Sequence, residues 1–102
     1  MTLADIRTML LQASVPVYYN HAPNGISVPF IIYRDASDNF GADNKVYHKV
    51  LHIDVELYST TKDTTLESSL ESIFENECIF WEKETYYMSD DEVYQTIYSM
   101  EV

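Results

Sequence analysis

The stretch from Lys45 to Tyr58 constrains the fold most, because apolar and polar side chains alternate along it. Val55 and Leu57 are apolar, whereas Asp54 and Glu56, at the positions between and before them, are charged. Successive side chains of a β-strand point to opposite faces of a sheet, so the pattern predicts a strand that is buried on one face and solvated on the other. The chain is therefore expected to contain a sheet that is covered on one side.

Six further segments carry helix or strand signals. Apolar residues recur with helical spacing over residues 2–13, where Thr2 can cap, and again over residues 66–74, with Thr61, Asp63 or Thr64 as the cap and Thr64 and Glu67 as a capping box. β-branched and aromatic runs predict strands over residues 15–19, 28–34, 79–88 and 92–102. The order α-β-β-β-α-β-β predicts an α+β fold: a mainly antiparallel sheet of four to five strands with two helices packed on one face.

Length and charge narrow the class of protein. The 102 residues suit a single domain, 1–102, and the lone Cys78 excludes an intrachain disulfide and is expected to be a small buried side chain. The net charge is -11, and residues 54–102 hold thirteen acids against Lys62 and Lys83. That balance argues against a surface that grips nucleic acid. The sequence shows no apolar signal core and no membrane span, so a cytoplasmic protein without a membrane partner is expected.

The search for catalytic chemistry gives little. Two glycines cannot build a phosphate-binding loop, and no nucleophile, base and orienting residue can be assembled, so the chain is predicted not to be an enzyme and to use no cofactor. His48 and His52 would lie about 13 Å apart on a strand, too far for one zinc ion. His52 with Asp54, and the turn acids Asp90, Asp91 and Glu92, are weak metal candidates, and no metal site is expected.

Several short phrases, spread over nearly the whole length of the chain, carry a family resemblance: Ile32-Tyr33-Arg34, residues 38–47, Val55-Glu56-Leu57-Tyr58 with Lys62-Asp63, residues 94–98 and Met100-Glu101-Val102. Through these phrases the chain resembles the tail terminators, the tail-completion and head-tail joining proteins of long-tailed phages and prophages of Gram-positive bacteria. The resemblance implies a structural protein that caps the tail tube, ends its polymerisation and joins the tail to the head.

The resemblance also implies the partners. Copies of the chain would form a hexameric ring that contacts the tail tube protein and a head-side connector or stopper protein, while DNA passes through without specific binding. The protein would act in the host cytoplasm during assembly and then in the virion tail. Six copies at -11 each would carry -66, a charge that repels a duplex and lets it slide.

Two groups of residues are candidates for interaction. The long polar loop Asp35–Asn44 is expected to dock on a neighbour through Asp38, Asn39, Phe40, Gly41 and Asp43. The acids Asp54, Glu56, Glu82 and Glu84 are expected on the ring lumen or on a face that meets a basic partner, although general solubility explains them equally well.

Other readings stay open. Another head-tail connector subunit would have the same size and role in the particle. A small acidic inhibitor that mimics DNA and binds a basic groove is the alternative of a different class, and it would expose carboxylates over a broad, continuous face. The pair Glu82 and Glu84 also has the spacing of a glycosidase carboxylate pair, but such pairs are common on solvated strands.

Overall fold

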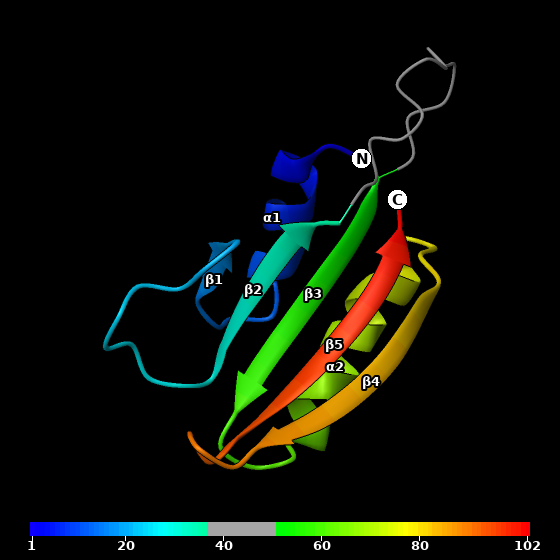
Figure 1. Ribbon diagram of the computed structural model, residues 1–102. Coiled ribbons are helices and arrows are strands. Elements are labelled where there is room, and N and C mark those ends of the chain that lie inside the picture. The colour runs from blue at the N-terminus through cyan, green and yellow to red at the C-terminus, as the bar shows by residue number, and fades with distance from the viewer. Residues whose placement is uncertain (37–50) are drawn as a thin grey trace.

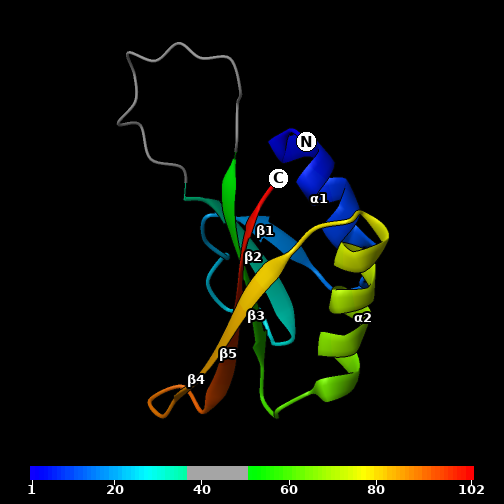
Figure 2. The same cartoon turned by 90° about the vertical axis from the view of Figure 1, so that its right-hand side faces the viewer.

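A five-stranded sheet with both helices on one side makes up the fold (Figures 1 and 2). The computed structural model describes residues 1–36 and 51–102. The elements in chain order are α1 (Leu3–Leu11), β1 (Val17–Tyr19), β2 (Phe30–Asp35), β3 (His52–Ser59), α2 (Thr64–Asn76), β4 (Trp81–Met88) and β5 (Val93–Glu101). The predicted α+β class and the element order are confirmed.

The strands lie in the order β1-β2-β3-β5-β4 (Figure 1). The pairs β2–β3, β3–β5 and β4–β5 are antiparallel, and β1 runs parallel to β2. The sheet is thus mixed rather than purely antiparallel. The chain leaves β1 at Asn20, whose φ is 71°, and residues 20–29 bring it back so that β2 starts beside the beginning of β1.

Helix α1 follows from its first-turn residues. Thr2 is the N-cap: its hydroxyl accepts a hydrogen bond from the backbone amide of Asp5, and the Asp5 carboxylate accepts one from the amide of Thr2. This capping box satisfies amides that have no partner inside the helix. Ile6, Met9 and Leu10 are buried against the sheet, as the helical spacing of the apolar residues requires.

Helix α2 begins one step away from the expected capping box. Asp63 is the N-cap, and its carboxylate accepts a hydrogen bond from the amide of Leu66. The prediction of a Thr64–Glu67 capping box is wrong, because the Glu67 carboxylate binds Lys62 and Lys83 instead. Asp and Thr are both good N-cap residues, so sequence alone did not decide between neighbouring positions.

The end of α2 corrects the expectation for Cys78, which is exposed rather than buried. Glu77 is the C-cap, and Cys78 follows it with a left-handed φ of 58°. The amide of Cys78 binds the carbonyl of Glu75, and the amide of Ile79 binds that of Phe74, which is the Schellman arrangement. The turn points the thiol outward and returns Ile79 to the core.

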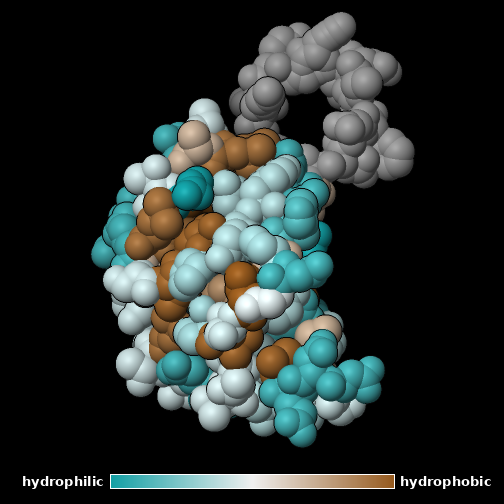
Figure 3. Space-filling view, turned by 90° about the vertical axis from the view of Figure 1, so that its left-hand side faces the viewer, coloured by the Kyte–Doolittle hydropathy of each residue, from teal (hydrophilic) through white to brown (hydrophobic). Residues whose placement is uncertain are grey.

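The core lies between the helices and one face of the sheet (Figure 2). Its buried members from the strands include Ile31, Ile53, Val55, Leu57, Tyr98 and Met100. Along β3 these positions alternate with His52, which is exposed, Asp54, which is half-buried, and Glu56, which is buried, so the face expected to be solvated is only partly so. The β1 edge is mixed: Figure 3 shows apolar side chains at the surface there among polar ones.

Candidate functional site

The sheet face away from the helices, called the open face here, is the candidate site. Figure 1 looks onto it, and Figure 2 shows both helices on the opposite side. Strand pairing sets which residues cross it in rows: Arg34, Asp54, Ser99 and Glu82 form one row, and Ile32, Glu56, Ile97 and Glu84 form the next. Both helices lie on the other side of the sheet, and most side chains of these rows are exposed or half-buried, whereas Ile32 and Glu56 are buried.

The register brings together the four acids that sequence analysis selected. Asp54 and Glu82 flank Ser99, while Glu56 and Glu84 flank Ile97, so all four lie on the open face. Only β5 lies between the members of each pair, so their backbones are two strand spacings of about 4.8 Å apart. Alternation along each strand puts Asp54 on the same face as Glu56 and Glu82 on the same face as Glu84, and the pairing of both strands with β5 puts the two pairs on one face.

Glu56 differs from the other three acids, because it is buried, with 7% of its surface exposed. The Arg34 Nε atom donates to its Oε2 atom at 2.8 Å, and the Tyr58 hydroxyl donates to its Oε1 atom at 2.7 Å. The hydrogen bond to Glu56 raises the pKa of Arg34 above its ordinary value. Burial, followed by the bond to Glu56, raises the pKa of Tyr58 to about 12. Glu56 therefore contributes a neutralised pair rather than a free charge.

Aromatic side chains occupy the open face beside this network. The rings of Phe30 and Tyr58 stack with centroids 5.0 Å apart, and Tyr18 meets Phe30 edge to face at 6.2 Å. Gln95, next to Tyr58 across the strand pair, donates to the Tyr58 hydroxyl at 2.8 Å. The open face thus has an aromatic half, toward the β4–β5 hairpin, and an acidic half, toward the start of β3.

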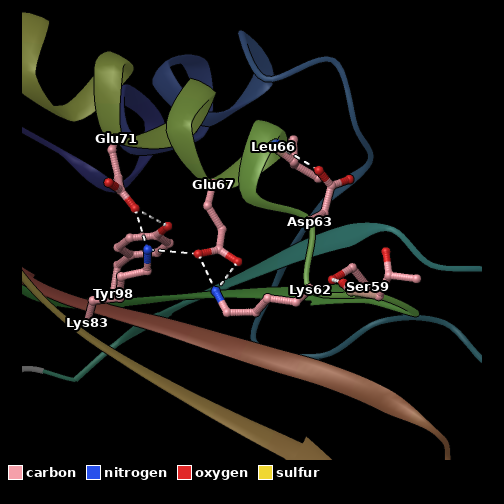
Figure 4. Close-up of polar contacts among 9 residues, drawn as sticks. Ser59, Lys62, Asp63, Leu66, Glu67, Glu71, Lys83 and Tyr98 are labelled. Carbon is pink, nitrogen blue, oxygen red and sulfur yellow. Dashed lines mark hydrogen bonds and ion pairs between the residues drawn. The ribbon is translucent and has the colours of Figure 1, made fainter.

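The two lysines of the second half of the chain do not lie on the acidic half of the open face. Lys62 and Lys83 both bind the Glu67 carboxylate on the helix side of the sheet, at 2.6 and 2.7 Å (Figure 4). Lys83 also binds Glu71, which accepts a hydrogen bond from the Tyr98 hydroxyl. In residues 54–102 no other lysine or arginine occurs, so Asp54, Glu82 and Glu84 have no cation from that half.

This helix-side cluster also sets the ionisation of its members. Burial alone would raise the pKa of Glu67, but the hydrogen bonds and charges of Lys62 and Lys83 outweigh it and hold the pKa below the ordinary value of 4.5. Burial and the hydrogen bond to Glu71 raise the pKa of Tyr98. The cluster ties α2 to β4 and β5.

Sequence reasoning missed two residues near the acidic half. Glu101 pairs with His52 across the strands, and its carboxylate lies 3.5 Å from the His52 Nδ1 atom. Phe80, 92% exposed, lies with Cys78 and Trp81 on a hollow of about 750 Å³ at this end of the sheet. Strand alternation could have identified both residues. Glu101 follows the buried Met100 and Phe80 lies between the inward-facing Ile79 and Trp81, so both side chains point away from the core.

The expected docking residues Asp38, Asn39, Phe40, Gly41 and Asp43 lie outside the described residues. Across residues 1–36 and 51–102, no group of three or more His, Cys, Asp and Glu side chains could hold a metal ion. In the same ranges, neither helix has the length and hydrophobicity needed to cross a bilayer. The open face therefore offers carboxylates, the Arg34–Glu56 ion pair and aromatic rings for contacts with a partner.

Comparison with known proteins adds no relative. A scan against protein-family models, a search of curated proteins and a search of solved structures each found no match to this chain.

Proposed function

We propose that this chain is a structural phage or prophage tail protein of the terminator type. It caps the tail tube, ends its polymerisation and joins the tail to the head as a ring through which DNA passes. The observation that carries the proposal is the open face, where Asp54, Glu82 and Glu84 lie together without a lysine from their half of the chain. The resemblance in sequence gives the class of particle.

The charge on this face suits a surface that a duplex must pass without being held. Nucleic acid is retained by cations that replace its counterions, whereas fixed carboxylates repel its phosphates. The aromatic half of the same face supports the proposed contacts with other particle proteins. Half-buried Tyr, Phe and Gln side chains are typical of protein interfaces, which provides a contact area for a tube or connector subunit.

The division of the open face also bears on the DNA-mimic alternative. A mimic needs carboxylates over a continuous area, but here the row beside the acids is aromatic, and Glu56 is neutralised by Arg34. These features favour assembly over mimicry. Another head-tail connector subunit would use the same face. The two roles differ in where the protein sits in the particle.

The decisive experiment is electron microscopy of tails from cells that make or lack this protein. Overlong, headless tails in its absence are expected, because nothing would stop the tube. Normal tails with normal heads attached would contradict the proposal. Tails of normal length that lack heads would assign the chain to a connector role instead.

The acidic half is tested separately by charge reversal. Particles carrying Asp54→Lys with Glu82→Lys should assemble but deliver DNA more slowly, because the conduit would then hold phosphates. The matched control is Glu75→Lys with Glu77→Lys, which makes the same charge change at exposed positions on and just after α2, away from the open face. Equal delivery by both variants would show that only total charge matters.

A further inference from the structure

We propose that the free edge of β4 pairs with β4 of a second copy of this chain, antiparallel and about a two-fold axis. This inference goes beyond the proposed function and does not rest on it. Strand β4 ends the sheet, and Glu82–Met88 are all exposed. On its outer side no strand of the described chain pairs with it, and such an edge is a template for another strand.

The two edges of the sheet differ in how they are protected. Strand β1 spans three residues and follows Pro16, so it offers few amides to a partner. Strand β4 spans eight residues without proline or glycine, and each of them pairs with β5 in one uninterrupted register. The β4 edge is therefore long and regular.

Lys83 does not guard the β4 edge. A lysine on an edge strand commonly discourages pairing by holding its charge beside the open backbone. The Lys83 Nζ atom instead lies 2.7 Å from carboxylate oxygens of both Glu67 and Glu71, on helix α2 (Figure 4). Its charge is used inside the subunit, which leaves the edge accessible.

The order of side chains along β4 selects a second copy as the partner. The first half of the strand carries Glu82 and Glu84, and the second half carries Tyr86 and Met88 on the same face. A two-fold antiparallel pair brings the first half of one copy beside the second half of the other. With Thr85 on the axis, Glu84 lies opposite Tyr86 and Glu82 opposite Met88, so no acid faces an acid.

Neighbouring arrangements lack this complementarity. Directly opposed residues of an antiparallel pair point to the same face of the sheet. Other registers of the β4 pair are therefore reached only by shifts that keep the open faces of the two copies on the same side. One step places Glu84 opposite itself. The step the other way shortens the paired segment to residues 84–88 and leaves Glu82 beside Asp90, in the turn that follows the partner's β4. Parallel pairing in register sets each acid beside its own copy. Like charges in these positions destabilise a sheet, which leaves the Thr85-centred register.

On the helix side of the same pairing, Lys83 of one copy lies opposite Tyr87 of the other. Tyr86 and Tyr87, which are 49% and 54% exposed in the single chain, both gain a cross-strand neighbour. The product is one continuous sheet with the helices of both copies on one side and their open faces joined on the other. The dimer thus extends the candidate surface instead of covering it.

The test uses the full chain and sedimentation velocity over a range of concentrations. The unaltered protein should sediment as a dimer. Thr85→Lys and Thr85→Glu each place like charges opposite one another on the axis, and each should raise the dimer dissociation constant roughly fivefold or more. An equimolar mixture of the two variants should recover the dimer, because opposite charges then meet.

Folding is checked by thermal unfolding of each variant, and Thr65→Lys and Thr65→Glu, at an exposed position on α2, provide the matched charge controls. These controls should dimerise like the unaltered chain. An unaltered chain that is a monomer at every concentration would overturn the proposal and leave the edge to a different protein. Assemblies that persist equally in both Thr85 variants, or a mixture that recovers no dimer, would also overturn it.

Discussion

Cys78 is one of four non-glycine residues in the described part of the chain that have a left-handed backbone, with Ser14, Asn20 and Glu92. It holds a left-handed φ of 58° at the position after the α2 C-cap, where glycine is most common. A Cβ atom in this conformation costs roughly 1–2 kcal/mol, and part of that is offset when glycine adds freedom to the unfolded chain. The exposed thiol makes no contribution to the core that would be lost on replacement.

Replacing Cys78 with glycine should therefore stabilise the protein. We expect Cys78→Gly to raise the free energy of unfolding by about 1 kcal/mol, measured by urea denaturation. Cys78→Ala is the control, since it removes the thiol but keeps the Cβ atom, and it should stay within about 0.5 kcal/mol of the original. Equal stability of the glycine and alanine variants would contradict the backbone explanation.

The exposure of Cys78 is a feature that its sequence neighbours did not predict. Its neighbours Ile79 and Phe80 are apolar, so burial was the natural expectation for a cysteine beside them. Exposure depends on the exact residue at which α2 stops, and propensities do not fix that residue. By contrast, Thr2 was readable as the cap of α1, because its hydrogen bond to the amide of Asp5 is made within one turn.

At the scale of elements, Glu67 connects α2 to the sheet. Its side chain is 5% exposed and binds Lys62 and Lys83, which are 40% and 33% exposed. Glu67→Gln should lower the free energy of unfolding by about 1–3 kcal/mol near neutral pH, an estimate reduced for the solvent screening of both lysines. Glu75→Gln, at an exposed position of the same helix, should change it by less than about 0.5 kcal/mol.

The pH dependence gives this prediction a second measurement. The pKa of Glu67 is lower in the folded protein than its ordinary value of 4.5, so the pair stabilises the fold fully above that value. The stabilisation is lost as the pH falls through the folded pKa. Urea denaturation at a series of pH values should show the gap between Glu67→Gln and the original closing in acid. A constant gap would mean that Gln disturbs packing rather than charge.

Elements were predictable where the pattern was local. The alternation of Val55 and Leu57 with Asp54 and Glu56 predicted both the strand and which of its side chains face the helices, but not the burial of Glu56. The parallel pairing of β1 with β2 was not predictable, because the direction of a three-residue strand depends on the path of residues 20–29. The neutralisation of Glu56 by Arg34 was also hidden, since only the β2–β3 register brings the two side chains together.

At the scale of the whole molecule, charge and shape act in opposite directions on association. The β4 edge offers backbone hydrogen bonds and a complementary order of side chains, whereas each chain carries -11. Two copies together carry -22, so long-range repulsion opposes the dimer. Short-range pairing at the edge does not depend on ions, but the repulsion does, because salt screens charges separated by more than about 8–10 Å at physiological strength.

The dimer should therefore tighten as salt is added. We expect the dissociation constant from sedimentation to fall several-fold between about 0.05 and 0.5 M sodium chloride, as the Debye length shortens. The variant Glu75→Lys with Glu77→Lys, whose substitutions lie outside β4, reduces the net charge of each chain from -11 to -7 and should show a tighter dimer at low salt with a weaker salt dependence. A dimer that loosens with salt would instead indicate contacts between opposite charges, in conflict with the acid–tyrosine register of the β4 pair.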